Sequence, residues 1–130
     1  FIIEDDEDLA VIFAEALQAA HFDTEIIHAG DTAITRLAAV TPDIVILDLH
    51  LPKVSGMGIL KQMRATPRLA RTKIIIATAD PVLGDALRDQ VDLALIKPVS
   101  FGQLRDLASR VGLALPAGEP LKPEASDPLS

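Results

Sequence analysis

Hydrophobic residues along this chain follow two patterns, short continuous runs and longer stretches with helical spacing. The runs lie at about residues 1–3, 44–47, 74–77 and 93–96, and a weaker one lies at about 24–28. Between them, hydrophobic positions recur every three or four residues, as on one face of an amphipathic helix. The pattern therefore predicts five β-strands that alternate with helices.

The central runs at 44–47 and 74–77 are hydrophobic at successive positions and not at alternate ones. A strand of this kind is buried on both faces, as in a parallel sheet covered by helices. Strand–helix units of this length predict an α/β fold, a three-layer α/β/α sandwich with the sheet in the middle. Ligands of such sheets bind beyond the carboxyl ends of the strands, where the connecting loops meet.

Polar residues follow four of the predicted strands at that edge. They are an acid pair, a lone acid, a hydroxyl and an amine, namely Glu4 with Asp5, Asp48, Thr78 and Lys97. Two carboxylates about 4 Å apart repel each other by roughly 4 kcal/mol at an effective dielectric near ~20, so one is protonated or a cation binds. Oxygen ligands suit Mg²⁺, and together with the amine and the hydroxyl they suit a phosphoryl group. We therefore predict phosphoryl chemistry on Asp48.

Each of these residues also has a simpler explanation when it is taken alone. Acids are favoured in the first turn of a helix, which accounts for Glu7 and Asp8 without a metal. Threonine is common in strands, and a lysine before a proline is often a surface residue. Asp80, two residues after Thr78, is predicted to cap a short helix. The prediction therefore depends on the combined set of strand ends.

Composition narrows the classes of function. A length of 130 residues fits one domain, and the net charge of −7 disfavours direct nucleic-acid binding. The chain has no Tyr or Trp on which bases could stack, and no hydrophobic stretch long enough to span a membrane. It has no cysteine, which is compatible with the expected cytoplasmic location. The chain opens inside the first predicted strand, so we expect further residues before Phe1.

The chain divides into a predicted folded domain at residues 1–113 and a tail or linker at 114–130. The folded part is expected to end with a helix at about residues 100–111. The tail contains four prolines among Gly, Ser and acidic residues and is predicted to be disordered. No Gly-rich nucleotide-binding motif is present, so the phosphate must come from a donor molecule.

The motifs together resemble the receiver domain of two-component response regulators. They are Ile3-Glu4-Asp5-Asp6, Asp48-Leu49-His50-Leu51-Pro52 followed by Gly56, Thr78-Ala79, and Lys97-Pro98. The resemblance covers the chain up to about residue 113 and implies a flavodoxin-like parallel sheet with strand order 2-1-3-4-5. It also implies a signalling domain, not a classical enzyme. Such a domain accepts a phosphoryl group from a histidine kinase or a phosphotransfer protein and loses it by slow autodephosphorylation.

The resemblance further implies roles for individual residues around the metal. Asp5 and the phosphoacceptor Asp48 are expected to bind Mg²⁺ directly. The backbone carbonyl of His50 is expected to be a further ligand, and Glu4 is expected to act through water. The side chain of His50 is expected to be exposed on the loop. Either it has no role of its own, or its imidazole affects the attack of water on the phosphorylated Asp48.

Thr78 and Lys97 are expected to contact the phosphoryl oxygens as members of the catalytic set. Two departures from the family pattern concern the output. Receivers usually carry Tyr or Phe three positions before that lysine, where this chain has Ala94, and the stretch from Thr78 to Lys97 is short. We therefore expect an atypical output switch. A protein partner or a dimer is expected to use the face formed by the fourth helix, last strand and last helix.

Two other functions compete with this interpretation. A receiver-like interaction scaffold that acts without phosphorylation is favoured by Ala94 and the short stretch, but it would not need all five site residues. A metal-dependent phosphohydrolase with Asp48 as its nucleophile usually needs a second acid two positions on, where this chain has His50. For none of the three do we expect direct contact with nucleic acid or with a membrane.

Overall fold

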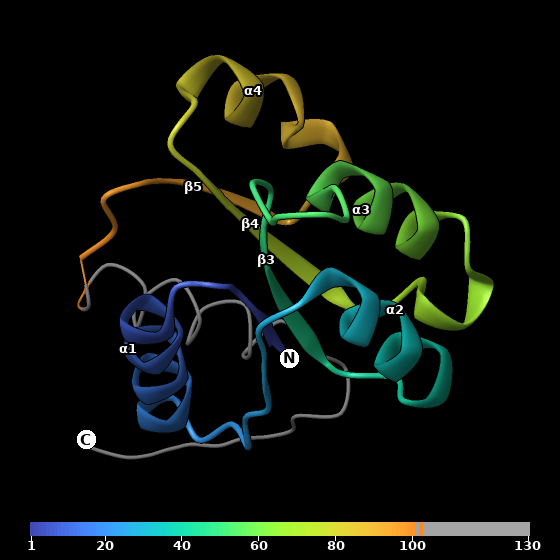
Figure 1. Cartoon of the computed structure of the whole chain (residues 1–130), viewed down its shortest axis with the longest axis horizontal. Coiled ribbons are helices and arrows are strands. Elements are labelled where there is room, and N and C mark those ends of the chain that lie inside the picture. Colours follow the sequence, from blue (N-terminus) through green and yellow to red (C-terminus); the bar gives the residue numbers. More distant parts are fainter. Residues whose placement is uncertain (101, 103–130) are drawn as a thin grey trace.

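The computed structural model describes residues 1–100 and 102. Within this part, five strands form one parallel sheet: β1 (Ile2–Ile3), β2 (Ile26–Ile27), β3 (Ile44–Asp48), β4 (Lys73–Thr78) and β5 (Leu93–Ile96). The strand order is β2-β1-β3-β4-β5, which confirms the predicted α/β class and topology (Figure 1). Apart from Ser100 and Gly102, the predicted last helix lies outside the described residues, as does the predicted tail.

Four helices connect the strands: α1 (Glu7–Ala19), α2 (Gly30–Ala39), α3 (Gly56–Arg64) and α4 (Pro81–Ala86). Two short 3₁₀ turns, Pro67–Leu69 and Arg88–Gln90, follow α3 and α4. Helix α1 lies on one face of the sheet, and α2, α3 and α4 lie on the other (Figure 1). The sheet is thus covered by helices on both faces, as predicted. None of the helices in the described part is long and apolar enough to cross a membrane.

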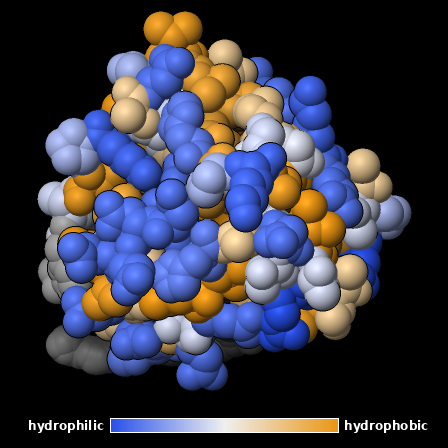
Figure 2. Space-filling model, in the orientation of Figure 1, coloured by the Kyte–Doolittle hydropathy of each residue, from blue (hydrophilic) through white to orange (hydrophobic). Residues whose placement is uncertain are grey.

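The central strand β3 supplies side chains to two hydrophobic cores. Val45 and Leu47 point toward α2 and α3, whereas Ile44 and Ile46 point toward α1. All four are buried, because successive residues of a strand face opposite sides and each side is covered. Burial of each such side chain is worth about 1.5–3 kcal/mol. The side of the surface that Figure 2 shows is largely hydrophilic, with hydrophobic residues visible between the polar ones.

The register of the strands brings the predicted site residues to one edge of the sheet. Asp48, the last residue of β3, pairs with Ala77 on β4. Backbone hydrogen bonds continue past the strand ends, from Leu49 N to the Ala77 carbonyl at 3.2 Å and from Lys97 N to the Thr78 carbonyl at 2.8 Å. The loops that carry the site therefore begin from positions fixed by the sheet.

Helix α4 has six residues, which confirms the prediction of a short fourth helix. Asp80 caps it, since its Oδ1 accepts hydrogen bonds from two N–H groups of the first turn at 3.0 and 3.2 Å. Gly84 lies inside the helix and is buried. A Cβ atom there would lie 2.7 Å from Cδ1 of Ile96 and 3.4 Å from Cγ2 of Thr78. The missing side chain therefore lets α4 lie close against the ends of β4 and β5.

Candidate functional site

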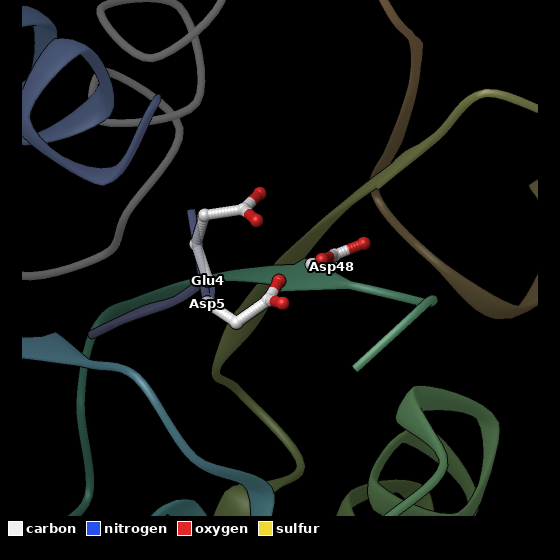
Figure 3. Close-up of side chains that lie close together, drawn as sticks. All are labelled: Glu4, Asp5 and Asp48. Carbon is white, nitrogen blue, oxygen red and sulfur yellow. The ribbon is translucent and has the colours of Figure 1, made fainter. Parts of the chain in front are cut away.

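Three carboxylates meet at the carboxyl edge of the sheet. Glu4 and Asp5 extend from the end of β1 toward Asp48 at the end of β3 (Figure 3). One carboxylate oxygen from each residue lies within 4.8 Å of the others. Glu4 and Asp48 are buried, with 1% and 2% of their surface exposed, whereas Asp5 is exposed. The cluster is thus open to solvent on the side of Asp5.

Backbone groups fix the loop that carries the two acids after β1. The N–H of Asp6 donates to Oε2 of Glu4 at 3.3 Å, and Nδ1 of His28 lies 3.0 Å from the Glu4 carbonyl oxygen. Asp6 also caps α1, because its Oδ1 accepts from the N–H of Leu9 at 3.0 Å. This turn joins β1 directly to α1 and leaves the Glu4 side chain inside the domain. The His28 contact was not predicted from the sequence.

Lys97 supplies the positive charge of the site. Its Nζ lies 3.1 Å from Oε1 of Glu4 and 3.5 Å from Oδ1 of Asp48. From the sequence, this amine is expected to contact a phosphoryl group on Asp48, and the structure adds Glu4 as its nearer partner. One ammonium group faces three carboxylates, so the cluster keeps an excess of negative charge. That excess favours a bound cation.

Burial and mutual contact separate the pKa values of the two buried acids. Burial, together with the hydrogen bond and charge of Asp48, raises the pKa of Glu4 to about 7, against the influence of Lys97. Burial alone would also raise the pKa of Asp48. The His50 N–H, the hydrogen bond with Glu4 and the charge of Lys97 outweigh it and hold the pKa of Asp48 below its ordinary value. A proton shared by the pair thus resides on Glu4 and leaves Asp48 ionised.

The raised pKa of Glu4 predicts that the metal-free domain loses stability as the pH rises from about 4.5 to about 7. In this window the folded chain keeps a proton that the unfolded chain has released, so the free energy of unfolding falls by about 2–3 kcal/mol. Asp48 acts in the opposite sense, since the stability from its ionised form is lost only as the pH falls through its lowered pKa. Chemical denaturation in the presence of a chelator, repeated across this pH range, measures how the free energy of unfolding changes with pH.

The matched variants for this prediction are Glu4→Gln and Glu15→Gln. Glu4→Gln removes the titrating group and is expected to flatten the fall in stability. Glu15 is an exposed glutamate on α1, so its replacement is expected to leave the slope unchanged. Parallel curves for the wild type and Glu4→Gln would contradict the assignment of the shared proton.

Thr78 and His50 form a second group beside the carboxylates. Thr78 is fully buried, and its Oγ1 accepts a hydrogen bond from the N–H of Asp80 at 3.0 Å. The Nε2 atom of His50 lies 2.8 Å from the same hydroxyl oxygen. The backbone N–H of His50 donates to Oδ1 of Asp48 at 2.9 Å. His50 therefore contacts both the acid and the hydroxyl of the site.

The His50 side chain is exposed on the loop, as expected, and the structure adds a contact that the sequence did not predict. The residue is exposed, yet its imidazole is hydrogen-bonded to a buried threonine. One signal in the sequence could have indicated this contact. In neighbouring parallel strands the residues that follow Asp48 and those that follow Ala77 lie side by side, so a polar side chain at position 50 comes near Thr78.

The donors at this edge fit a divalent cation of the Mg²⁺ type. Carboxylate oxygens from Asp5 and Asp48, with the nearby Glu4, are hard ligands of the kind that Mg²⁺ binds. The chain has no cysteine that would favour a softer metal. An ionised Asp48 next to Lys97 also offers a nucleophilic oxygen in a place where negative charge is stabilised. The geometry is suited to phosphoryl transfer onto a carboxylate.

Comparison with protein families and curated proteins agrees with this geometry. The family model of the response regulator receiver domain matches residues 1–109. The phosphate regulon transcriptional regulatory protein PhoB of Rhizobium meliloti is 35% identical over 106 residues, which are 79% of this chain and 47% of that protein. The DNA-binding response regulator MtrA of Mycolicibacterium smegmatis is 32% identical over 123 residues, 91% of this chain and 50% of that protein. The chain thus spans about half the length of these relatives.

Solved structures show the same fold. The CheY-like response regulator receiver domain from Methylobacillus flagellatus matches with a TM-score of 0.74 and 28% identity, covering 85% of this chain and 94% of that one. The receiver domain of sensor histidine kinase PA1611 from Pseudomonas aeruginosa, with a magnesium ion in its active site cleft, matches with the same TM-score and 23% identity. The match covers 85% of this chain and 94% of the PA1611 receiver domain. With the family model matching most of its length, this chain belongs to the response regulator receiver domain family.

Proposed function

We propose that this domain accepts a phosphoryl group on Asp48, in a Mg²⁺-dependent reaction, from a histidine kinase or a phosphotransfer protein. One observation carries the proposal. A buried carboxylate whose pKa is held below its ordinary value lies 3.5 Å from Lys97, within a cluster of three carboxylates. Membership of the receiver family supports the same role.

The metal would be held by the carboxylates of Asp5 and Asp48 and by the backbone carbonyl of His50, with Glu4 acting through water. When bound, Mg²⁺ would offset the negative charge of the phosphoryl oxygens and of the three carboxylates. The carboxylates themselves support this assignment. The PA1611 receiver domain holds a magnesium ion in its active site cleft. At 23% identity, its similarity to this chain shows a shared fold alone.

The residues of the chain supply the remaining chemistry. An oxygen of Asp48 attacks the phosphorus, and the bond from phosphorus to the donor breaks as the new bond to Asp48 forms. Lys97 and the hydroxyl of Thr78 stabilise the negative charge on the phosphoryl oxygens. Slow attack of water on the phosphorylated Asp48 would later release inorganic phosphate and restore the carboxylate. The domain thus acts as a reversible signal, not as an enzyme with a separate substrate.

The partner that reads this signal is proposed to bind near α4 and β5. The hydroxyl of Thr78 accepts a hydrogen bond from the N–H of Asp80, the residue that caps α4, so a change at the hydroxyl affects the start of this helix. PhoB and MtrA are regulators about twice as long as this chain, and any contact with DNA is a property of those whole proteins. For the residues of this chain, with a net charge of −7, we propose protein partners and no direct contact with nucleic acid.

The partly buried Ala94 keeps a second function open, an interaction scaffold that is never phosphorylated. The residue packs against the core on the side of α2 and α3, where it offers a methyl group and no ring that could move with Thr78. Such a scaffold would present the same surface in all conditions. Uptake of phosphate on Asp48 separates the two functions.

The test is uptake of phosphate from an acyl phosphate of low molecular mass, followed by intact-protein mass spectrometry. We expect the wild type to gain the mass of one phosphoryl group with Mg²⁺ and no mass with a chelator. Asp48→Asn should abolish the gain, because an amide is a far weaker nucleophile than an ionised carboxylate. Asp43→Asn is the matched control, since Asp43 lies exposed just before the other end of β3.

Three outcomes discriminate. Uptake by the wild type and by Asp43→Asn, but not by Asp48→Asn, supports the proposal. Uptake by Asp48→Asn would assign the phosphate to another residue. The scaffold would be favoured if the wild type took up no phosphate from the acyl phosphate or from histidine kinases. Its NMR spectrum would then also be unchanged by beryllofluoride.

A further inference from the structure

We propose that His50 is a positioning residue, whose imidazole donates a hydrogen bond to Thr78 and thereby directs the threonine hydroxyl proton at the phosphoryl group. This inference rests on the proposed function and deepens it. It concerns the side chain of His50, which is distinct from the backbone carbonyl assigned to the metal.

His50 connects two strand ends. Its backbone N–H donates to Oδ1 of Asp48 at 2.9 Å, and its Nε2 lies 2.8 Å from Oγ1 of Thr78. The hydrogen bond from Leu49 N to the Ala77 carbonyl extends the pairing of β3 and β4 by one residue. That extension holds the start of the loop against β4, so the imidazole of the next residue reaches the hydroxyl.

The hydrogen-bonding capacity of a hydroxyl decides the direction of these bonds. A threonine hydroxyl has one proton to donate and two lone pairs that accept. The N–H of Asp80 already occupies one lone pair of Thr78. If Nε2 of His50 carries a proton, it occupies the second lone pair, and the hydroxyl proton is left to donate elsewhere. If Nε2 has no proton, the imidazole accepts the hydroxyl proton and none remains for a phosphoryl oxygen.

Thr78 can donate to the phosphoryl group only when Nε2 of His50 carries a proton. Thr78 is fully buried, and its carbonyl oxygen accepts from Lys97 N at 2.8 Å, so its backbone is fixed at the strand end. Rotation of the hydroxyl proton is the freedom that remains, and two N–H donors directed at the oxygen would remove it. His50 would therefore raise the affinity of the site for a phosphoryl group and leave the metal ligands untouched.

Beryllofluoride, a stable stand-in for the phosphoryl group on Asp48, provides the test at one fixed pH. The chain contains no Tyr or Trp, so the binding is followed by calorimetry or ¹⁹F NMR. We expect His50→Ala to weaken the beryllofluoride complex about tenfold, the equivalent of one hydrogen bond. His50→Gln should restore most of the affinity, since its amide N–H₂ can donate to Thr78. The Mg²⁺ affinity of both variants should equal that of the wild type, because every residue supplies a backbone carbonyl.

A double-mutant cycle isolates the contact. In a Thr78→Val background, His50→Ala is expected to cause no further loss of beryllofluoride affinity. The same loss in that background, or a parallel loss of Mg²⁺ affinity, would show that His50 acts on the loop and would overturn the inference. Unchanged binding by His50→Ala would overturn it as well, whereas failure of the wild type itself to bind beryllofluoride would overturn the proposed function.

The unmodified domain offers an independent measurement. In ¹⁵N NMR spectra of its beryllofluoride complex, Nε2 of His50 is expected to carry a proton. A spectrum in which Nε2 is unprotonated would overturn the inference without any substitution. This measurement does not depend on the stability of a variant.

Discussion

Replacing Gly56 with alanine is expected to lower the stability of the domain by about 3 kcal/mol or more. A Cβ atom at this position would lie 2.5 Å from the carbonyl oxygen of Asp48 and 2.6 Å from Cα of Leu49. Both are backbone atoms in a buried strand end, so they cannot move aside as a flexible side chain can. The added methyl group must displace either α3 or the strand that carries the acid, a clash at the upper end of overpacking costs. Urea denaturation measures the loss.

The neighbouring Gly58 provides a control of the same chemistry. It lies in the same helix, and a Cβ atom there meets nothing within 4 Å. Gly58→Ala is therefore expected to stabilise the domain by about 0.5–1 kcal/mol, because alanine favours the helix more than glycine does. Equal effects of the two substitutions would show that the close approach of Gly56 to Asp48 does not determine stability.

Replacing Lys97 with methionine is expected to lower stability by about 2–3 kcal/mol in the absence of metal at neutral pH. The substitution leaves buried Glu4 and Asp48 without their ammonium partner, and removal of one member of a buried ion pair is strongly destabilising. Under the proposed function, the same variant should bind Mg²⁺ more tightly than the wild type. The reason is that the ion and the lysine neutralise the same carboxylates, so the ion gains when its competitor is removed.

Two measurements check this prediction, denaturation in chelator and calorimetric titration with Mg²⁺. Lys61→Met is the control, since Lys61 is exposed on α3 and the same change there removes a charge that is not paired with Glu4 or Asp48 among the described ion pairs. Equal stability of Lys97→Met and Lys61→Met without metal would show that the ammonium group does not stabilise the two buried carboxylates. Weaker binding of Mg²⁺ by Lys97→Met would contradict the competition between the two cations.

The central part of the fold could be predicted because its pattern has one physical explanation. Unbroken hydrophobic runs occur where a strand is covered on both faces, and β3 and β4 show this pattern in full. Once those strands are parallel neighbours, Asp48 and Thr78 must lie at the same edge. The weaker run at 24–28 was harder to delimit, and only Ile26–Ile27 forms β2. An edge strand pairs on one side only, so its hydrophobic pattern specifies its ends less strongly.

The details of the site depend on side-chain directions that hydrophobic patterns do not contain. Glu4 and Asp5 are adjacent, and the resemblance to receiver domains implies a direct metal contact for Asp5 and a water-mediated role for Glu4. In the structure Glu4 is the buried acid of the pair and is paired with Lys97, whereas Asp5 is exposed. Which of two neighbours faces inward is set by the register of β1 against β3. The contact of His50 with Thr78 depends on loop geometry in the same way.

The close approach at Gly84 has a consequence for how α4 behaves as a unit. Six residues with a glycine among them are too few to remain helical alone in water, because helix nucleation is unfavourable and glycine opposes propagation. The helical state of α4 therefore depends on its contact with the ends of β4 and β5. For this segment, packing against the sheet and helical structure are thus coupled, and Thr78 forms part of the surface that supports the helix.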